Sequence, residues 1–417
     1  MMAGKNQSDK PLKTQILIIG GGIAGLTLAL LLAGRDMKVN LVEPYPPESP
    51  AKTKITGRTI ALMQTSLNVL KAAGLEKFCE EHGTKMKKMR IIDDSIGNQP
   101  VITSEFEAQD IGLEYFSRNI PNAPLRSAAY QNAKTHKNIT IHEKTSLEDF
   151  TIQDNSFVIA TLSSGETITT PLLIGADGRQ SLVRKLSGIK TSKKEYKQSA
   201  ITCIINHSRS HENISTEFHR PAGPFALVPL QGNQSSVVWV EGHEKAEALL
   251  KLKKQEFTEA LQNQTNDILG GITLETGPEL WPLCAIKAKS ITAKRTALIA
   301  EAAHVMSPIT AQGLNLSLRD VASLAETIID AYRLGQDYGS DTILRNYASR
   351  RSIDIETRFF GVDKMNSIVS NDIKPLKDLR RNALKIVDRV APIKKFAMRH
   401  GLAPALDTGR LMEGKTL

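Results

Sequence analysis

The sequence of 417 residues is poor in several features that mark particular classes of protein. Its three cysteines, Cys79, Cys203 and Cys284, lie far apart and show no CxxC or Cys/His spacing, which excludes a disulfide framework and a zinc site. We therefore expect a reducing, cytoplasmic compartment. The nine histidines are scattered, and we predict no metal site. With 41% hydrophobic and 24% charged residues, the composition is that of a globular protein long enough for two domains.

One long uncharged stretch has the length of a membrane-spanning helix. Residues 16–34 are nineteen consecutive uncharged residues. Gly20, Gly21, Gly22 and Gly25 interrupt its first half and disfavour a helix there. We interpret the stretch instead as a buried strand, a glycine-rich turn and a buried helix.

Positive charge is concentrated at the C-terminal end of the chain. The net charge is +10, and residues 374–417 contribute +7, from eleven Lys/Arg and four Asp/Glu. The rest is nearly neutral, which argues against nucleic-acid binding as the main function. From Leu376 to Val390 apolar residues recur at helical spacing among basic ones. Such a helix can lie on an anionic membrane surface or pack its apolar stripe on the protein body, and both interpretations stay open.

The glycine-rich turn has the spacing of a dinucleotide-binding motif. Residues 20–25 read G-G-G-I-A-G, which fits G-x-G-x-x-G between a strand and a helix. The three glycines of that pattern allow a tight turn, a close approach to pyrophosphate and close packing of the helix. The next predicted strand, 37–42, ends in Glu43, whose carboxylate can accept hydrogen bonds from ribose hydroxyls and repels a 2′-phosphate. The motif predicts FAD or NAD rather than NADP.

Two later stretches favour FAD over NAD. An apolar strand delivers Asp177 to its carboxyl end, and a second one ends in another acid, Glu301. Residues 312–315 then lead into a helix that we predict over 316–334. The carboxyl ends of strands in an open α/β sheet face the ligand, and a helix N-terminus offers free amides to the anionic edge of a reduced flavin.

With these three motifs in this order, the chain resembles the class A flavin-dependent monooxygenases of p-hydroxybenzoate hydroxylase type. Among them it is most similar to the hydroxylases of ubiquinone biosynthesis. The resemblance spans nearly the whole chain, and its most specific segments are residues 312–320 and 223–230. It implies an FAD-dependent aromatic hydroxylase that acts on a polyprenylated phenol through a flavin C4a-hydroperoxide. O2 and NAD(P)H, or another electron donor, would be its co-substrates.

The resemblance also implies which residues contact FAD, from the pyrophosphate and ribose to the ribityl chain and flavin ring. They are Gly20, Gly22, Ala24, Gly25, Glu43, Arg58, Arg126, Asp177, Glu301, Gly313, Leu314 and Asn315. It assigns no catalytic side chain, because the cofactor carries the chemistry and the protein supplies orientation and a dry pocket. We interpret His304 as a structural member of the cofactor motif rather than a catalytic base.

The sequence departs from the family where the flavin ring is expected. Ala300-Glu301 stands in place of the usual Gly-Asp, and Ala311 in place of the usual glycine before Gln312. Glutamate keeps the charge and the acceptor atoms of aspartate but adds a methylene group. These changes weaken the assignment of the flavin site more than that of the family.

The order of elements predicts an α/β protein. Its doubly wound, Rossmann-like FAD-binding domain carries an inserted β-sheet substrate domain and a C-terminal helical segment. In the proposed division, residues 11–90, 126–194 and 286–340 form the FAD-binding domain, 91–125 and 195–285 form the substrate domain, and 341–417 form the helical region with its basic tail. Strands at 197–205, 225–230 and 235–240 are expected to cover the flavin.

Two other functions remain compatible with the sequence. One is an FAD monooxygenase of a small soluble aromatic compound. The other is a flavin-binding scaffold in a ubiquinone-biosynthesis complex, which Glu301 and Ala311 would suit. The expected location is cytoplasmic, with peripheral contact to the inner face of the membrane if the basic tail binds lipid.

Overall fold

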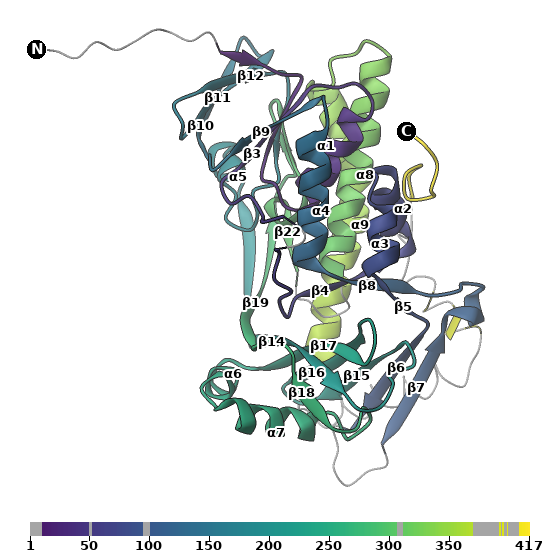
Figure 1. Ribbon diagram of the computed structural model, residues 1–417. Helices are drawn as coiled ribbons and strands as arrows, with labels where there is room; N and C mark the ends of the chain where they lie inside the picture. Colours follow the sequence, from purple (N-terminus) through teal and green to yellow (C-terminus); the bar gives the residue numbers. More distant parts are fainter. Residues whose placement is uncertain are drawn as a thin grey trace, which may run out of the picture.

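The computed structural model describes residues 11–49, 52–94, 101–306, 312–369 and 408–417, together with residues 392, 394, 395 and 398. Figure 1 shows a parallel sheet beside a group of long helices, and a larger sheet at the opposite end of these helices. Ala311 and most of the basic tail, including the predicted helix from Leu376 to Val390, lie outside the described residues.

A six-stranded sheet in the order β20-β21-β13-β2-β3-β9 carries the glycine-rich turn. All its neighbouring strands run parallel except β20 and β21. Its strands are β2 (Ile16–Ile19), β3 (Val39–Glu43), β9 (Ile139–Glu143), β13 (Leu173–Gly175), β20 (Thr292–Ala293) and β21 (Thr296–Leu298). β2, β13 and β21 are short, mostly apolar and entirely buried, as expected for strands covered on both faces.

Long helices cover one side of this sheet. Helix α1 is apolar all round and buried along its whole length, because it packs against the sheet and against α4 and α8 (Figure 1). The helices of this part are α1 (Ile23–Ala33), α2 (Gln64–Ala72), α3 (Glu76–His82), α4 (Asn122–Thr135), α5 (Leu182–Leu186), α8 (Gln312–Arg333) and α9 (Asp341–Val369).

A four-stranded sheet in the order β1-β12-β11-β10 packs its apolar residues into the same core. Its strands are β1 (Leu12–Lys13), β10 (Leu147–Gln153), β11 (Phe157–Leu162) and β12 (Thr167–Thr170). The parallel sheet, its helices and the helical C-terminal part confirm the predicted Rossmann-like α/β class. The domain bounds drawn from the sequence stay a prediction.

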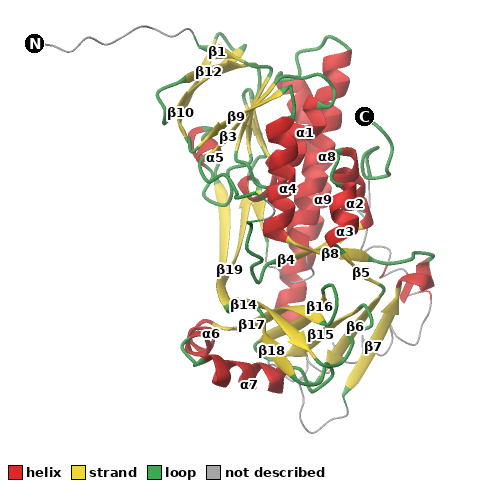
Figure 2. Ribbon diagram, in the orientation of Figure 1, coloured by secondary structure: helices red, strands yellow, loops and turns green. Residues whose placement is uncertain are grey.

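A nine-stranded, mostly antiparallel sheet forms the other end of the molecule (Figure 2). Eight strands follow the order β22-β19-β14-β17-β16-β15-β6-β7, and β18 pairs with β14. The strands are β6 (Lys88–Asp93), β7 (Ile102–Glu107), β14 (Thr191–His207), β15 (Ile214–Arg220), β16 (Gly223–Pro229), β17 (Gln234–Gly242), β18 (Ile272–Leu274), β19 (Glu279–Ala288) and β22 (His304–Val305). Helices α6 (His243–Leu250) and α7 (Lys254–Gln264) contribute to an apolar core on one face, around Phe218, Phe225 and Trp239.

A small sheet in the order β4-β8-β5 lies between the two ends (Figure 2). Its strands are β4 (Thr59–Met63), β5 (Thr84–Met86) and β8 (Ser117–Pro121), and a 3-10 turn at Ala108–Ile111 precedes β8. Helix α9, with 29 residues, packs along α8 and also contacts β16. It therefore links the parallel sheet's helices to the nine-stranded sheet.

Three predicted elements differ from the structure. The strand expected before Glu301 ends at Leu298, and a 3-10 turn at Ala300–Ala302 follows because Ala300 adopts a left-handed φ of 56°. Helix α8 begins at Gln312 rather than at residue 316, so the motif residues form its first turn. Strand β14 extends beyond the predicted 197–205 at both ends.

The end of the chain folds back onto the helices. Leu411 and Met412 are buried, the Leu411 N–H donates to the Glu326 carboxylate at 2.9 Å, and Asn68 donates to the Met412 carbonyl at 2.8 Å. The last residues of the basic tail thus pack on the body. Among the residues that the structure describes, no helix is both long and apolar enough to span a bilayer.

Candidate active site

The glycine-rich turn between β2 and α1 is shaped by backbone contacts. Gly20 has a φ of 110°, and a Cβ placed on it would lie 2.3 Å from the Ala176 carbonyl oxygen. A Cβ on Gly25 would lie 2.1 Å from the carbonyl oxygen of Gly20. Gly22 differs, because a Cβ there would have no atom within 4 Å. Two glycines thus close the turn, and the third borders open space at the start of α1.

The N-terminus of α1 has the properties of an anion site. Its N-cap is Gly22, and no side chain caps the helix or places an acid in its first turn. The first backbone N–H groups of a helix have no partner within the helix and carry its positive dipole end. A pyrophosphate in front of Gly22 would satisfy them, so this turn fits the phosphates of a dinucleotide.

Glu43 and Arg126 brace the same turn. Glu43 is buried at the end of β3, and its carboxylate accepts hydrogen bonds from the N–H groups of Gly21 at 2.7 Å and Tyr45 at 2.6 Å. Arg126 lies 3.1 Å from this carboxylate and donates to the carbonyls of Gly21 and Tyr45, both at 2.8 Å. The acid has lone pairs left for ribose hydroxyls, whereas the guanidinium is largely committed to the protein backbone.

Asp177 lies beyond the end of β13, opposite Gly20. Its Oδ2 accepts hydrogen bonds from Leu182 at 2.7 Å and Val183 at 3.1 Å, and so caps the short helix α5. Its Oδ1 is buried and has no hydrogen-bond partner among the described residues. Burial raises the pKa of Asp177 above its ordinary value, against the lowering effect of the Ser181 hydroxyl and the backbone N–H groups. A buried acceptor without a donor fits a ligand hydroxyl at this position.

Glu301 lies on the 3-10 turn after β21. It is about half exposed and faces Arg179, with 3.5 Å between its Oε2 and the Arg179 Nε. Arg184 joins the two motifs by donating to the carbonyls of Ala302 and Arg179, both at 2.8 Å. The structure therefore brings the turn of Asp177 and the turn of Glu301 together at one edge of the parallel sheet.

The first turn of α8 contains Gly313, Leu314 and Asn315. Gly313 is exposed, with nothing within 4 Å of an added Cβ, so its backbone is accessible. The Asn315 side chain is bound elsewhere: it accepts hydrogen bonds from Met63 N–H at 3.0 Å and Ser66 Oγ at 2.7 Å, and it donates to Ala61 at 2.9 Å. Asn315 thus anchors the start of α8 to β4 and α2.

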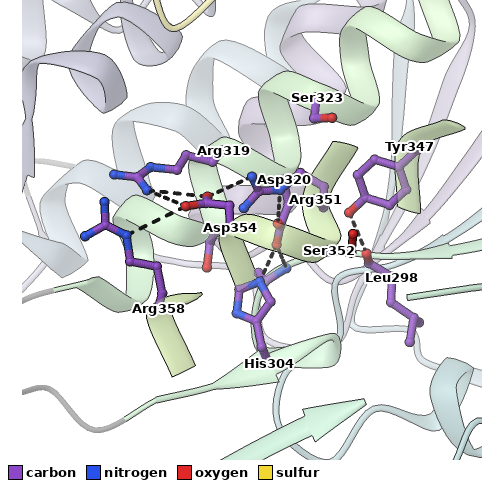
Figure 3. Close-up of polar contacts among 12 residues, drawn as sticks. Leu298, His304, Arg319, Asp320, Ser323, Tyr347, Arg351, Ser352, Asp354 and Arg358 are labelled. Atoms are coloured by element: carbon purple, nitrogen blue, oxygen red, sulfur yellow. Dashed lines mark hydrogen bonds and ion pairs between the residues drawn. The ribbon is translucent and has the colours of Figure 1, made fainter. Parts of the chain in front are cut away.

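A buried ionic network supports this end of the site (Figure 3). The Asp320 carboxylate on α8 accepts from the Ala300 N–H at 3.1 Å, from His304 Nε2 at 2.5 Å and from Arg351 Nε at 2.8 Å. Arg351 also donates to Asp354 at 2.8 Å, as does Arg319 at 3.1 Å. His304 is buried within this network, in keeping with the structural role expected from the sequence.

The charges of the network stabilise one another. Burial alone would raise the pKa of Asp320, but His304 and Arg351 hold it below its ordinary value. Burial likewise opposes the ionised form of Asp354, whose pKa Arg351 and Arg319 lower. Burial lowers the pKa of Arg319 to about 10. No role was assigned to Asp320 from the sequence. An acid within a mostly apolar stretch of a helix is the signal that could have identified it.

Arg58 contacts the nine-stranded sheet. Its guanidinium carbon lies 4.5 Å from the ring centroid of Trp281 on β19, and the Trp281 indole donates to Thr202 at 3.1 Å. Next to it, a Cβ on Gly57 would lie 2.7 Å from the backbone of Thr202. Arg58 thus stands where β4 meets the large sheet.

The fold and the glycine-rich turn define a dinucleotide-binding α/β protein with a second, sheet-containing part. A family model described as "FAD binding domain" matches residues 13–356. The chain is 33% identical to "Ubiquinone hydroxylase UbiL" of Rhodospirillum rubrum, over 96% of this chain and 93% of that protein. It is 28% identical to "Ubiquinone hydroxylase UbiM" of Neisseria meningitidis, over 92% and 84%.

Among solved structures, p-nitrophenol 4-monooxygenase PnpA from Pseudomonas putida superposes with a TM-score of 0.78 at 16% identity, over 95% of this chain and 100% of that one. This likeness shows the shared fold. The chain belongs to the family of FAD-dependent monooxygenases that contains the ubiquinone hydroxylases.

Proposed function

We propose that the protein hydroxylates the aromatic ring of a polyprenylated phenol on the way to ubiquinone, with FAD as cofactor. The names of its two bacterial relatives, which both act as ubiquinone hydroxylases, support this substrate class. The structural observation that carries the FAD site is the α1 N-terminus at Gly22, which no described side chain caps, together with the buried Asp177 Oδ1, which has no hydrogen-bond partner among the described residues. When bound, FAD reduced by NAD(P)H or another donor activates O2 for transfer of one oxygen atom to the ring.

The proposed cofactor contacts follow the geometry of the two motifs. Backbone groups at Gly20, Gly22, Ala24 and Gly25 would hold the pyrophosphate, and Glu43 the adenosine ribose. We propose further contacts from Asp177 and Glu301 to hydroxyls of the cofactor, and from the amides of Gly313, Leu314 and Asn315 to the flavin ring. Arg126 would act mainly by fixing the glycine-rich turn. Arg58 would contact FAD from the border with the large sheet.

The decisive experiment is deletion of the gene in its host, with identification of the accumulated quinone precursor by mass spectrometry. We expect a precursor that lacks one ring hydroxyl group, and recovery on complementation. The purified protein should be yellow and should contain FAD. An unchanged quinone profile, or well-folded protein free of FAD, would refute the proposal.

A flavin-binding scaffold is the second candidate, because Ala300 and Glu301 depart from the family at the flavin end and Ala300 is strained. Anaerobic titration with NAD(P)H, followed by reoxidation in air, separates the two functions. A hydroxylase should reoxidise at a rate that depends on substrate, whereas a scaffold should not. A small soluble phenol as the true substrate would show itself in the same assay by outperforming prenylated phenols.

Membrane contact and membership of a ubiquinone-biosynthesis complex are finer parts of the proposal. The +7 charge of residues 374–417 would attract the chain to an anionic bilayer, where a prenylated substrate resides. Co-sedimentation of full-length protein and of a chain ending at Pro375 with anionic liposomes tests this role. Equal binding of both forms to the liposomes would refute a role of the tail in membrane contact.

A further inference from the structure

One face of the nine-stranded sheet carries three ionisable side chains on neighbouring strands. The register places Thr202, Val238, Ala226 and Glu217 side by side across β14, β17, β16 and β15. Paired residues of neighbouring strands point to the same face. We call the face that carries these four residues the inner face. His219, two residues after Glu217, lies on it as well, with Asp93 of β6 as its register partner.

The inner face is the one that meets the FAD-binding part. Ser236, which shares this face with Val238, forms a hydrogen bond of 2.7 Å between its hydroxyl and that of Thr59 on β4. Asn119 on β8 donates to the Pro229 carbonyl at 3.0 Å. Figure 2 shows the same arrangement, with β4 and β8 on one side of the sheet and α6 and α7 on the other.

The inner face is also less completely covered than the outer one. Val238, Ala226 and Glu217 keep part of their surface accessible to solvent. Their neighbours on the outer face, Val237, Leu227 and Phe218, are at most 2% exposed beneath α6 and α7. Small apolar side chains beside a partly exposed acid form a surface on which an aromatic ring could lie with its hydroxyl group toward His219.

His219 is incompletely hydrogen-bonded on this surface. Its Nε2 lies 3.0 Å from Glu217 Oε1, and its side chain is only 7% exposed. Its Nδ1 is buried and has no hydrogen-bond partner among the described residues. His207, a buried histidine of β14, uses both ring nitrogens, with Arg209 O at 2.7 Å and Ser235 Oγ at 3.1 Å. When Nε2–H donates to Glu217, Nδ1 of the neutral ring is a bare acceptor that needs a donor.

We propose that His219, held by Glu217, is the base that accepts the phenolic proton of the substrate. The inference rests on the proposed function, since a phenol is the donor that Nδ1 would meet. The phenol O–H bond breaks, Nδ1–H forms, and the phenolate directs electron density into the ring for oxygen transfer. The ring C–H proton released on rearomatisation returns to the phenolate oxygen. The proton held on Nδ1 passes to the second oxygen atom of O2, which leaves as water, and the neutral ring of His219 is restored. FAD, O2 and NAD(P)H supply the redox balance.

Two carboxylates lie on the strands that hold His219. Glu217 on its own strand and Asp93, fully buried on β6, are the carboxylates beside it. On β16 the register partner is Pro224, which cannot titrate. The next residue of β15, Arg220, points to the other face and pairs with Asp94 at 3.0 Å. The imidazolium formed by the transfer would therefore have two acidic neighbours on the inner face.

A chromophoric phenol tests the base without turnover. 2-Allyl-4-nitrophenol changes its absorption on ionisation, so its spectrum reports the protonation state of the bound phenol. It is titrated into the oxidised FAD-loaded enzyme at a pH below the pKa of the free probe. We expect the nitrophenolate band with wild-type protein, its loss in His219→Gln and a weaker band in Glu217→Gln. The matched control His207→Gln should behave as wild type, with FAD content confirming that each variant folds.

Steady-state turnover gives an independent readout. His219→Gln should lose about 100-fold or more in kcat with an ordinary phenol, and a more acidic ring-fluorinated phenol should restore most of it. A purely structural histidine would give the same loss with both substrates. The same nitrophenolate fraction in His219→Gln as in wild type, or a neutral or unbound probe in wild type, would overturn the assignment. If a quinone precursor nevertheless accumulates in the deletion strain, such a result refutes only the role of His219 as the base and leaves the hydroxylase function intact.

Discussion

The proposed cofactor site has an adenosine end and a flavin end, which are built on different physical principles. The adenosine end around Gly20 and Gly25 is fixed by backbone atoms in close contact, which leave no room for a side chain. The flavin end around Ala300 and Glu301 is held by a buried carboxylate, Asp320, that ties a strained turn to two helices. The first end depends on the space that glycine leaves, and the second on charges that are paired only in the folded protein.

Removal of the charge at the flavin end should have the largest effect on stability. Asp320→Asn would leave Arg351 and His304 without their shared carboxylate inside the protein, at a cost of about 3–5 kcal/mol in the free energy of unfolding. Asp330→Asn is the matched control, because Asp330 is half exposed and pairs with Arg410 at the surface, where a loss of about 0–1 kcal/mol is expected. Denaturant unfolding of both variants checks the contrast, and equal losses would contradict it.

At the adenosine end, Gly25→Ala should lower the free energy of unfolding by about 1–3 kcal/mol and abolish FAD retention, because the new Cβ would overlap the Gly20 carbonyl oxygen.

Gly22→Ala adds a Cβ to the same turn at a position where no atom lies within 4 Å of it. We expect it to change stability by less than about 1 kcal/mol but to weaken FAD binding, since the added methyl would occupy the place proposed for the pyrophosphate. Thermal unfolding and FAD content per protein distinguish the two outcomes. If Gly22→Ala kept full FAD binding, the pyrophosphate would have to lie elsewhere.

Ala300→Gly should stabilise the protein by about 1 kcal/mol, because it relieves the left-handed backbone at φ 56°. The thermal midpoint of the FAD-free protein measures the effect without a contribution from cofactor binding. A lower midpoint would show that the Ala300 methyl group contributes more by packing than it costs in strain.

The smallest effect concerns pH. His304 and Arg351 depress the pKa of Asp320 in the folded state. The Asp320 carboxylate therefore contributes its full stabilisation above the unfolded pKa of an aspartate, about 3.9. This contribution declines as pH falls through the lower pKa of the folded state. The stability difference between wild type and Asp320→Asn should therefore be constant near neutral pH and shrink only below about pH 4. Acid titrations followed by circular dichroism test this, and a difference that already shrinks near pH 6 would point to another group.

Local patterns predicted the adenosine end well. The strand, turn and helix of residues 16–33 were readable because their hydrophobic periodicity and glycine spacing reflect contacts between near neighbours in the chain. The α/β class and the strands of the large sheet followed from the same kind of signal, and the family followed from the resemblance of the motifs in their order. The start of α8 and the break before Glu301 were misplaced, since propensities do not reveal that Ala300 takes a left-handed conformation.

The sequence by itself determined the glycine-rich turn and the acid Glu43 at the end of the next strand, because these groups lie within one strand-helix-strand unit. Only the tertiary structure joined Asp320 to His304 and Arg351, and placed Glu217 and His219 on the sheet face that meets β4 and β8. Pairing of charges across long separations, and the choice of which face of a strand is covered, depend on how distant segments pack. Such contacts leave no periodic trace in a single sequence.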